Sequence, residues 1–190
     1  GANAVLDVQS GVLDYGDAMV TATQPVSSVF SIATSSTVRS SGAANFPLSG
    51  GGTHTFASTT FAYGSTVELY GAAQSVAGSD RGVTSYGVLR LLGEGAKTLT
   101  GGVSILDSLR IDSPVTFDDN GNTLVYGPGT VLRYRMAGDS IPSSQTLQTT
   151  GDEFPAVNGP ATVVIDNPKH VRLHDNRSLS MGMEFLRGKM

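Results

Sequence analysis

Seven carboxylates are the residues of this chain that could do the most chemistry: Asp107, Asp112, Asp118, Asp119, Glu153, Asp166 and Asp175. A glycan-cleaving site needs two carboxylates at a defined separation, or carboxylates that hold a metal ion beside a basic residue. Most of the seven stand next to Gly, Asn, Pro or Ser, where an aspartate usually stabilises a turn. In a solenoid, where successive coils lie about 4.8 Å apart, carboxylates far apart in sequence could converge.

Asp118, Asn120 and Asn122 occupy alternate positions, as the first ligands of a calcium-binding loop do. Such a loop also needs glycine at its sixth position and glutamate at its twelfth, where this chain has Thr123 and Gly129. The pattern therefore predicts a turn. We expect no cofactor, with weak calcium binding at this turn as the alternative.

His170 and His174 would share one face of a helix and indicate a metal site there. Residues 171–173 between them read as a strand, which separates the two histidines by about 13 Å. His54 stands alone, and the chain has no cysteine. It also lacks a nucleophile elbow, a P-loop and a dinucleotide fingerprint. We therefore assign no catalytic, cofactor-binding or metal-binding residue.

The composition indicates an all-β chain. Of 190 residues 24 are glycine, and 15% are charged, against about a quarter in an average protein. Short strands separated by tight turns suit this composition. The net charge of −4 indicates no basic face for nucleic acid, and no apolar run approaches the roughly 18 residues of a membrane helix. A basic cluster that includes Arg177 and Arg187 is interpreted as a solvated surface.

A recurring phrase indicates how the strands are arranged. Residues 37–44 (TVRSSGAA) return at 66–73 (TVELYGAA), and a looser copy occupies 130–137 (TVLRYRMA). Like segments that recur every 20–25 residues or so suit a solenoid, because each coil stacks on the one before it. We predict a right-handed parallel β-helix over residues 1–190, with an antiparallel β-sandwich as the alternative.

Two loops, near residues 40–52 and 141–160, are expected to interrupt the repeat. Residues 183–190 read as a further strand rather than a cap, so we expect a segment of a larger protein whose open ends meet neighbouring domains or chains. Eight aliphatic side chains are predicted to stack inside: Val38, Val67, Val131, Leu91, Ile105, Ile111, Val164 and Leu173.

Three stretches resemble the β-helical repeat regions of large secreted and surface proteins of Bacteroidetes-type bacteria. Residues 64–76 (GSTVELYGAAQSV) are similar to the phrase G-x-T-V-E-Y-x-G-x-x-Q-x-V, and residues 86–99 (YGVLRLLGEGAKTL) to Y-x-x-L-x-L-x-G-x-G-x-K-T-L. Residues 164–173 (VIDNPKHVRL) are similar to L-x-I-x-N-P-x-G-V-x-L, with His170 in place of the usual glycine. The resemblance covers roughly residues 60–186 and implies the stalk of an adhesin-like protein, commonly exported by the type IX route.

Asp107-Ser108-Leu109 and Asp139-Ser140-Ile141 resemble the O-glycosylation sites of such exported proteins. Together these features predict a non-catalytic structural or adhesive spacer, secreted or on the cell surface. Its expected partners are a glycan or another surface ligand and neighbouring chains, without nucleic acid and without membrane insertion. The alternative is part of a carbohydrate-active β-helix enzyme, either a polysaccharide lyase or a glycoside hydrolase.

Overall fold

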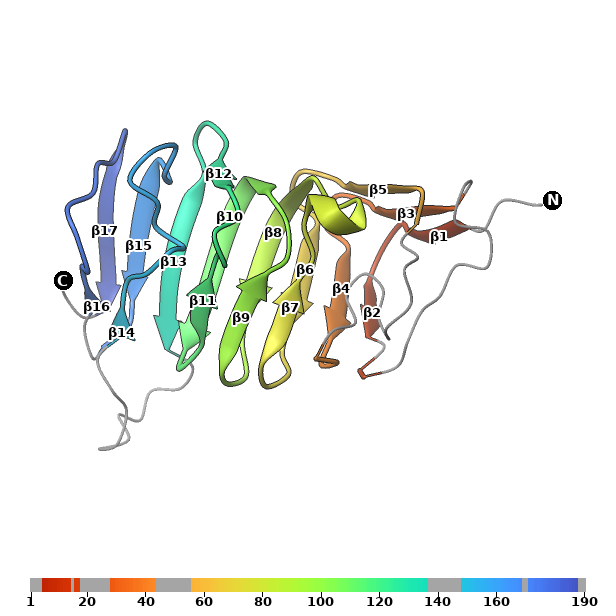
Figure 1. The fold of residues 1–190 in the computed structure, drawn as a ribbon, viewed down its shortest axis with the longest axis horizontal. Coiled ribbons are helices and arrows are strands. Elements are labelled where there is room, and N and C mark those ends of the chain that lie inside the picture. The colour runs from red at the N-terminus through yellow and green to blue at the C-terminus, as the bar shows by residue number, and fades with distance from the viewer. Residues whose placement is uncertain are drawn as a thin grey trace.

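The computed structural model describes residues 5–14, 16–17, 28–43, 56–136, 148–168 and 171–187. The chain is all-β, with 51% of its residues in strands, and its parallel strands stack as a β-solenoid of about six turns. Figure 1 shows the coils following one another along the long axis, with the two termini at opposite ends. The fold class predicted from the repeats is confirmed.

One long sheet runs through the whole described structure. Its strands, in spatial order, are β2 (Val12–Asp14), β4 (Thr37–Ser40), β6 (Thr66–Leu69), β8 (Ser85–Leu91), β10 (Val103–Ser113), β13 (Val131–Met136), β15 (Thr162–Asp166) and β17 (Gly182–Arg187). A further strand, β12 (Leu124–Tyr126), pairs with the first part of β10, whose last part pairs with β13. Because β10 has a register shift between Ile105 and Ser108, it turns a corner and belongs to two faces of the solenoid.

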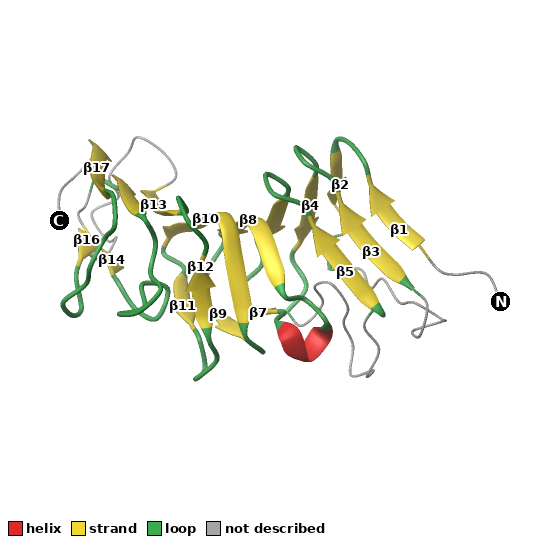
Figure 2. Cartoon of the chain, turned by 90° about the horizontal axis from the view of Figure 1, so that it is seen from above, coloured by secondary structure: helices red, strands yellow, loops and turns green. Residues whose placement is uncertain are grey.

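Shorter sheets form the other faces. The first contains β1 (Val5–Val8), β3 (Val29–Ile32) and β5 (Ser58–Phe61). The others are β7 (Gln74–Val76), β9 (Ala96–Leu99) and β11 (Thr116–Asp118), and the pair β14 (Gln148–Thr149) and β16 (Val171–Arg172). Figure 2 shows β1, β3 and β5 as a layer in front of β2 and β4, and the short helical turn η2 (Ser79–Arg81) between β7 and β8. No helix in these described ranges is long and apolar enough to cross a membrane.

The strand register reproduces the recurring phrase. Thr37 lies opposite Thr66 and Val38 opposite Val67, so two copies of the phrase stack directly across an interval of 29 residues. The next interval, from Thr66 to Val88, is 22 residues. Every pairing found between described strands is parallel, which excludes the hairpins of the sandwich alternative.

Alternate residues of the long sheet point inward and form two columns that are aliphatic except for Tyr134. The first column contains Val38, Val67, Leu89, Leu109, Leu132 and Val163, and the second contains Leu69, Leu91, Ile111, Tyr134 and Ile165. Each of these side chains is at most 1% exposed. Burying such a side chain contributes about 1.5–3 kcal/mol relative to leaving it in water, so the columns supply much of the cohesion between coils.

Five of the eight predicted stacking residues are in the core, namely Val38, Val67, Leu91, Ile105 and Ile111. The predictions for Val131 and Leu173 are wrong. Val131 lies opposite Ser108 in the outward row of Thr66, because the third copy of the phrase is shifted by one residue, and Leu173 is 37% exposed beyond β16. Val164 is buried, with 8% of its surface exposed, but it lies opposite Arg133 in an outward row and outside the inner cluster. A shift of one residue moves a side chain to the opposite face of a strand.

Aromatic rings fill the core of the N-terminal coils. Phe30 contacts both Phe56 and Phe61, each at a ring-centroid distance of 5.3 Å, and Phe61 contacts Tyr86 at 5.5 Å. The glycine of the recurring phrase has a packing role, since a Cβ atom on Gly71 would lie 2.0 Å from the carbonyl oxygen of Ser41. This close approach of two coils leaves no room for a side chain at Gly71.

The strands at both ends of the long sheet carry exposed apolar side chains. At one end Val12 is 64% exposed, and at the other Phe185 and Leu186 of β17 are 47% and 51% exposed. The residues of β17 form a strand, as the sequence suggested. Of the two expected loops, residues 44–52 and 141–147 lie outside the described residues, while residues 148–160 contain β14 followed by turns.

Candidate functional site

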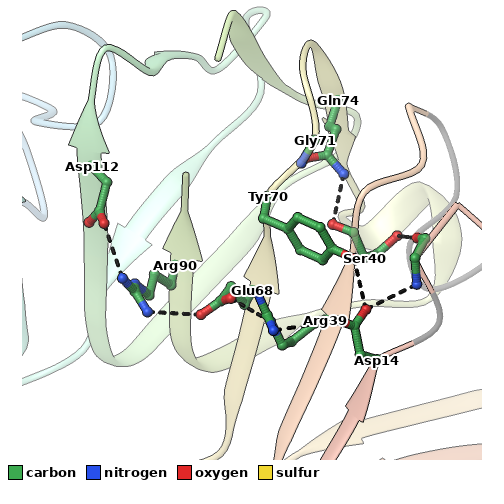
Figure 3. A network of polar contacts seen from close by, with 10 residues as sticks. Asp14, Arg39, Ser40, Glu68, Tyr70, Gly71, Gln74, Arg90 and Asp112 are labelled. Atoms are coloured by element: carbon green, nitrogen blue, oxygen red, sulfur yellow. Dashed lines mark hydrogen bonds and ion pairs between the residues drawn. The ribbon is translucent and has the colours of Figure 1, made fainter. Parts of the chain in front are cut away.

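A line of alternating charges crosses the outward face of the long sheet. Arg39 Nη1 lies 3.4 Å from Asp14 Oδ2, and Arg39 Nε donates to Glu68 Oε1 at 2.6 Å. Arg90 donates to Glu68 Oε2 at 2.9 Å and to Asp112 Oδ2 at 3.1 Å. Figure 3 shows these contacts running from Asp14 to Asp112, and we call them the charge ladder.

Asp166 extends the charge ladder toward the C-terminal coils. Its two carboxylate oxygens accept hydrogen bonds from Arg133 Nη2 at 2.7 Å and Arg187 Nε at 2.6 Å. Burial alone would raise the pKa of Asp166, but the hydrogen bonds and charges of Arg187 and Arg133 outweigh it and hold the pKa below its ordinary value. Arg187, interpreted from the sequence as solvated, therefore fastens β17 to the sheet.

The charge ladder contributes to register more than to stability. The Glu68 side chain is 9% exposed, whereas its partners Arg39 and Arg90 are 35% and 27% exposed. Exposed ion pairs contribute about 0–1 kcal/mol, and burying a charge carries a desolvation cost that offsets part of any gain. A one-residue slip of β6 would turn Glu68 into the core, so the pairs favour a single alignment of the coils.

The C-terminal part of the charge ladder borders the cavity that we take as the candidate functional site. The cavity has a volume of about 180 Å³ and is lined by Arg90, Arg110, Asp112, Arg133, Arg135 and Asp166. Asp112 and Asp166 are two of the seven carboxylates singled out from the sequence, and stacking brings them to one place. Both are ion-paired with arginines, so acid–base chemistry at either would first require these pairs to open.

Two interior polar side chains join three coils beneath the charge ladder. Gln74 Nε2 donates to the carbonyl oxygens of Ser40 at 3.2 Å and Gly42 at 3.0 Å. Lys97 Nζ donates to Gln74 Oε1 at 2.8 Å and to the carbonyl oxygens of Gly71 and Ala72 at 2.7 and 2.6 Å. Burial lowers the pKa of Lys97 from 10.5 to about 8.

Sequence reasoning did not assign these two residues a role. Gln74 on β7 and Lys97 on β9 are each at most 3% exposed. The signal that could have found them is their position in the phrases at 64–76 and 86–99, where a long polar side chain alternates with apolar residues. Buried polar groups of this kind are retained only where hydrogen bonds satisfy them.

Glu153 is a buried carboxyl that is hydrogen-bonded within the fold. It is 3% exposed, and its Oε1 accepts hydrogen bonds from Tyr134 Oη at 2.6 Å and the backbone nitrogen of Gly151 at 2.8 Å. Tyr126 Oη donates to the Glu153 carbonyl oxygen. Burial raises the pKa of the Glu153 carboxyl, and it raises the pKa of both tyrosines as well.

The predicted turn at 118–122 is present. Asp118 accepts a hydrogen bond from the backbone nitrogen of Asn120, and Asp119 accepts one from Gly121, each at 2.8 Å. Asp152, which sequence reasoning missed because it belongs to the next coil, brings its carboxylate within 4.8 Å of those of Asp118 and Asp119. Both aspartates are engaged in turn hydrogen bonds, and calcium binding at this place stays a prediction.

The remaining candidates are dispersed. Asp175 is ion-paired with Arg177, and His174 contacts Thr150 Oγ1 at 2.8 Å. Asp107 lies with Arg110 and Val164 along a second, shallower cavity on the outward face. His54 and His170 lie outside the described residues, so the predicted spacing of His170 and His174 stays a prediction.

Of the two motifs that resemble O-glycosylation sites, the structure describes the first, Asp107-Ser108-Leu109. Ser108 is 4% exposed, and its Oγ accepts a hydrogen bond from Arg110 Nε at 3.2 Å, so this side chain is largely buried in the folded chain. The second motif, Asp139-Ser140-Ile141, lies outside the described residues.

Comparisons of the chain with protein-family models, with curated proteins and with solved structures give no match. The class that the fold defines is therefore the parallel β-solenoid, and a finer assignment depends on the features of this chain alone.

Proposed function

We propose that the chain is a structural and adhesive spacer in an exported bacterial surface protein. The observation that supports this is the uninterrupted parallel stack of the long sheet, whose aliphatic columns and charge ladder both run from coil to coil. Because each coil contacts only its neighbours, such a stack acts as a rod whose length grows with the number of coils.

The surface location and the adhesive role rest on the resemblance of residues 64–76, 86–99 and 164–173 to bacterial surface proteins. In this role the rod holds a ligand-binding face away from the cell, and the ligand is a glycan or another surface molecule. The exposed apolar strands at the ends, which include Phe185 and Leu186, would contact neighbouring coils or chains.

Mechanical unfolding tests the spacer function. Force applied between Val5 and Arg187 of the full chain should release coils one after another. Coil lengths run from 20 residues between Val88 and Ser108 to 31 between Val131 and Thr162. Each step should therefore add about 6–10 nm of contour length. Extension without discrete steps at low force would contradict a load-bearing rod.

Protease treatment of intact cells that make the protein tests its location. A surface protein should release peptides of this chain before the cells are lysed. Release only after lysis, with an intact outer envelope shown by a periplasmic marker, would contradict the exported role.

A further inference from the structure

One arginine in the cavity of the charge ladder lacks the counter-charge that its neighbours have. Arg110 lies between Arg90 and Arg133 in a single outward row, on strands about 4.8 Å apart. Arg90 pairs with Glu68 and Asp112, and Arg133 pairs with Asp166. Arg110 forms no ion pair with any of the described residues, and its one side-chain hydrogen bond there goes to Ser108.

The cavity has an excess of positive charge. Four arginines line it against two aspartates. Burial lowers the pKa of Arg110, and the adjacent charges of Arg133 and Arg90 lower it further, while Asp107 and Asp112 act in the opposite direction. The carboxylates around these neighbouring guanidinium groups do not fully neutralise them. A bound anion would therefore stabilise the arrangement.

Two buried polar atoms of residues that line the same cavity have no hydrogen-bond partner. They are Asp112 Oδ1, an acceptor, and Arg133 Nε, a donor. Asp112 is 5% exposed, and Figure 3 shows only one of its two carboxylate oxygens joined to Arg90. Both atoms are closed off from solvent, so a ligand in the cavity does not reach them directly, and they show only that the polar groups around the cavity are incompletely paired.

We propose that this cavity binds an acidic sugar, whose carboxylate or sulfate group lies against the guanidinium groups of Arg110 and Arg133. A planar guanidinium binds such oxyanions through paired hydrogen bonds. A neutral sugar leaves the charge of Arg110 uncompensated. The inference rests on the adhesive part of the proposed function and names its ligand.

Calorimetric titration of the full chain tests the site with four probes: a galacturonic acid trisaccharide, a sulfated galactose trisaccharide, the neutral galactose trisaccharide and a short single-stranded DNA. We expect binding of one or both acidic saccharides, which identifies the anionic group, and at least tenfold weaker binding of the neutral one. Equal binding of all three saccharides, no binding of either acidic one, or equally tight binding of the DNA would overturn the proposal.

Two variants locate the binding. Arg110→Gln should weaken binding of the acidic saccharide at least tenfold. Arg172→Gln, which removes the same charge from the exposed side of β16, should change it less than twofold. Unchanged binding by Arg110→Gln would refute the site.

Nuclear magnetic resonance of the unsubstituted chain gives a second readout that does not depend on the folding of a variant. The Nε–H signals of Arg110 and Arg133 should shift on titration, while that of Arg172 stays fixed. Absence of these shifts in the presence of binding would place the ligand elsewhere. Stepwise unfolding under force without saccharide binding would leave the spacer function standing and remove only this inference.

Discussion

Replacing Leu109 by alanine tests the central physical claim, that inward columns hold the coils together. Leu109 is fully buried on β10, between Leu89 of β8 and Leu132 of β13. Truncation of a buried leucine to alanine costs about 2–5 kcal/mol, depending on how far the site collapses. The two neighbours in the column are fixed by strand spacing and cannot move in, so we expect a cost near the upper half of that range.

The loss can be converted to a melting temperature. For a chain of this size each kcal/mol lowers the midpoint by about 2–4 °C, so a loss of about 4 kcal/mol corresponds to about 8–16 °C. Far-UV circular dichroism is the appropriate probe, because the chain has no tryptophan. Urea unfolding of the same variant gives the free energy, and the slope of the transition shows whether both proteins expose the same surface.

Leu186→Ala is the matched control. The chemical change is the same, but Leu186 on β17 is 51% exposed, so we expect a change within about 0.5 kcal/mol. Both variants are compared at a concentration where sedimentation shows a monomer, since association through the end strand would bury Leu186. Equal losses in the two variants would refute the assignment of the column.

Two further predictions concern the polar contacts. Glu68→Gln should lower the free energy of unfolding by about 1–3 kcal/mol, because it removes the carboxylate that lies between Arg39 and Arg90. The loss should shrink in 1 M salt, where the repulsion between the two arginines is screened. The exposed turn variant Glu94→Gln should change stability little in either salt, and urea titrations that rank the two variants equally would contradict the charge ladder. The pKa of Lys97 is lower in the folded chain, about 8 against 10.5, so the unfolded state binds more protons between these values and stability should rise by about 2 kcal/mol from pH 7 to 9.5. Lys97→Met should flatten that rise in melts followed at each pH, whereas an unchanged slope would show that Lys97 is not its source.

The fold could be predicted because stacking leaves a repeat in the sequence. The first four residues of the two phrases, 37–40 and 66–69, lie in register in the structure. Whether a strand side chain points into the core or outward was harder to predict, since valine suits either face of a strand. The third copy of the phrase predicts Val131 inside, but that copy is shifted by one residue, and Val164 is buried in an outward row.

The charge ladder was visible in the sequence but was not recognised. Arg39 and Glu68 occupy the same offset in two copies of the phrase, and an opposite charge at the same offset predicts an ion pair between adjacent coils. Arg90, Arg110 and Arg133 could not be aligned in this way. Their coils share no phrase, and the register shift in β10 changes the spacing between them. The cavity depends on this three-dimensional alignment, which no local pattern specifies.

Neighbouring coils make the same contacts although the chain between them varies in length. The pair Arg90 and Asp112 joins residues 22 apart, while the pair Arg133 and Asp166 joins residues 33 apart. Lengthening a flexible connection adds little entropy cost, about 0.6 kcal/mol for each doubling. The stack therefore accommodates connections of different lengths, and the molecule offers an engineer a display scaffold whose inserts would be held at fixed intervals along one axis.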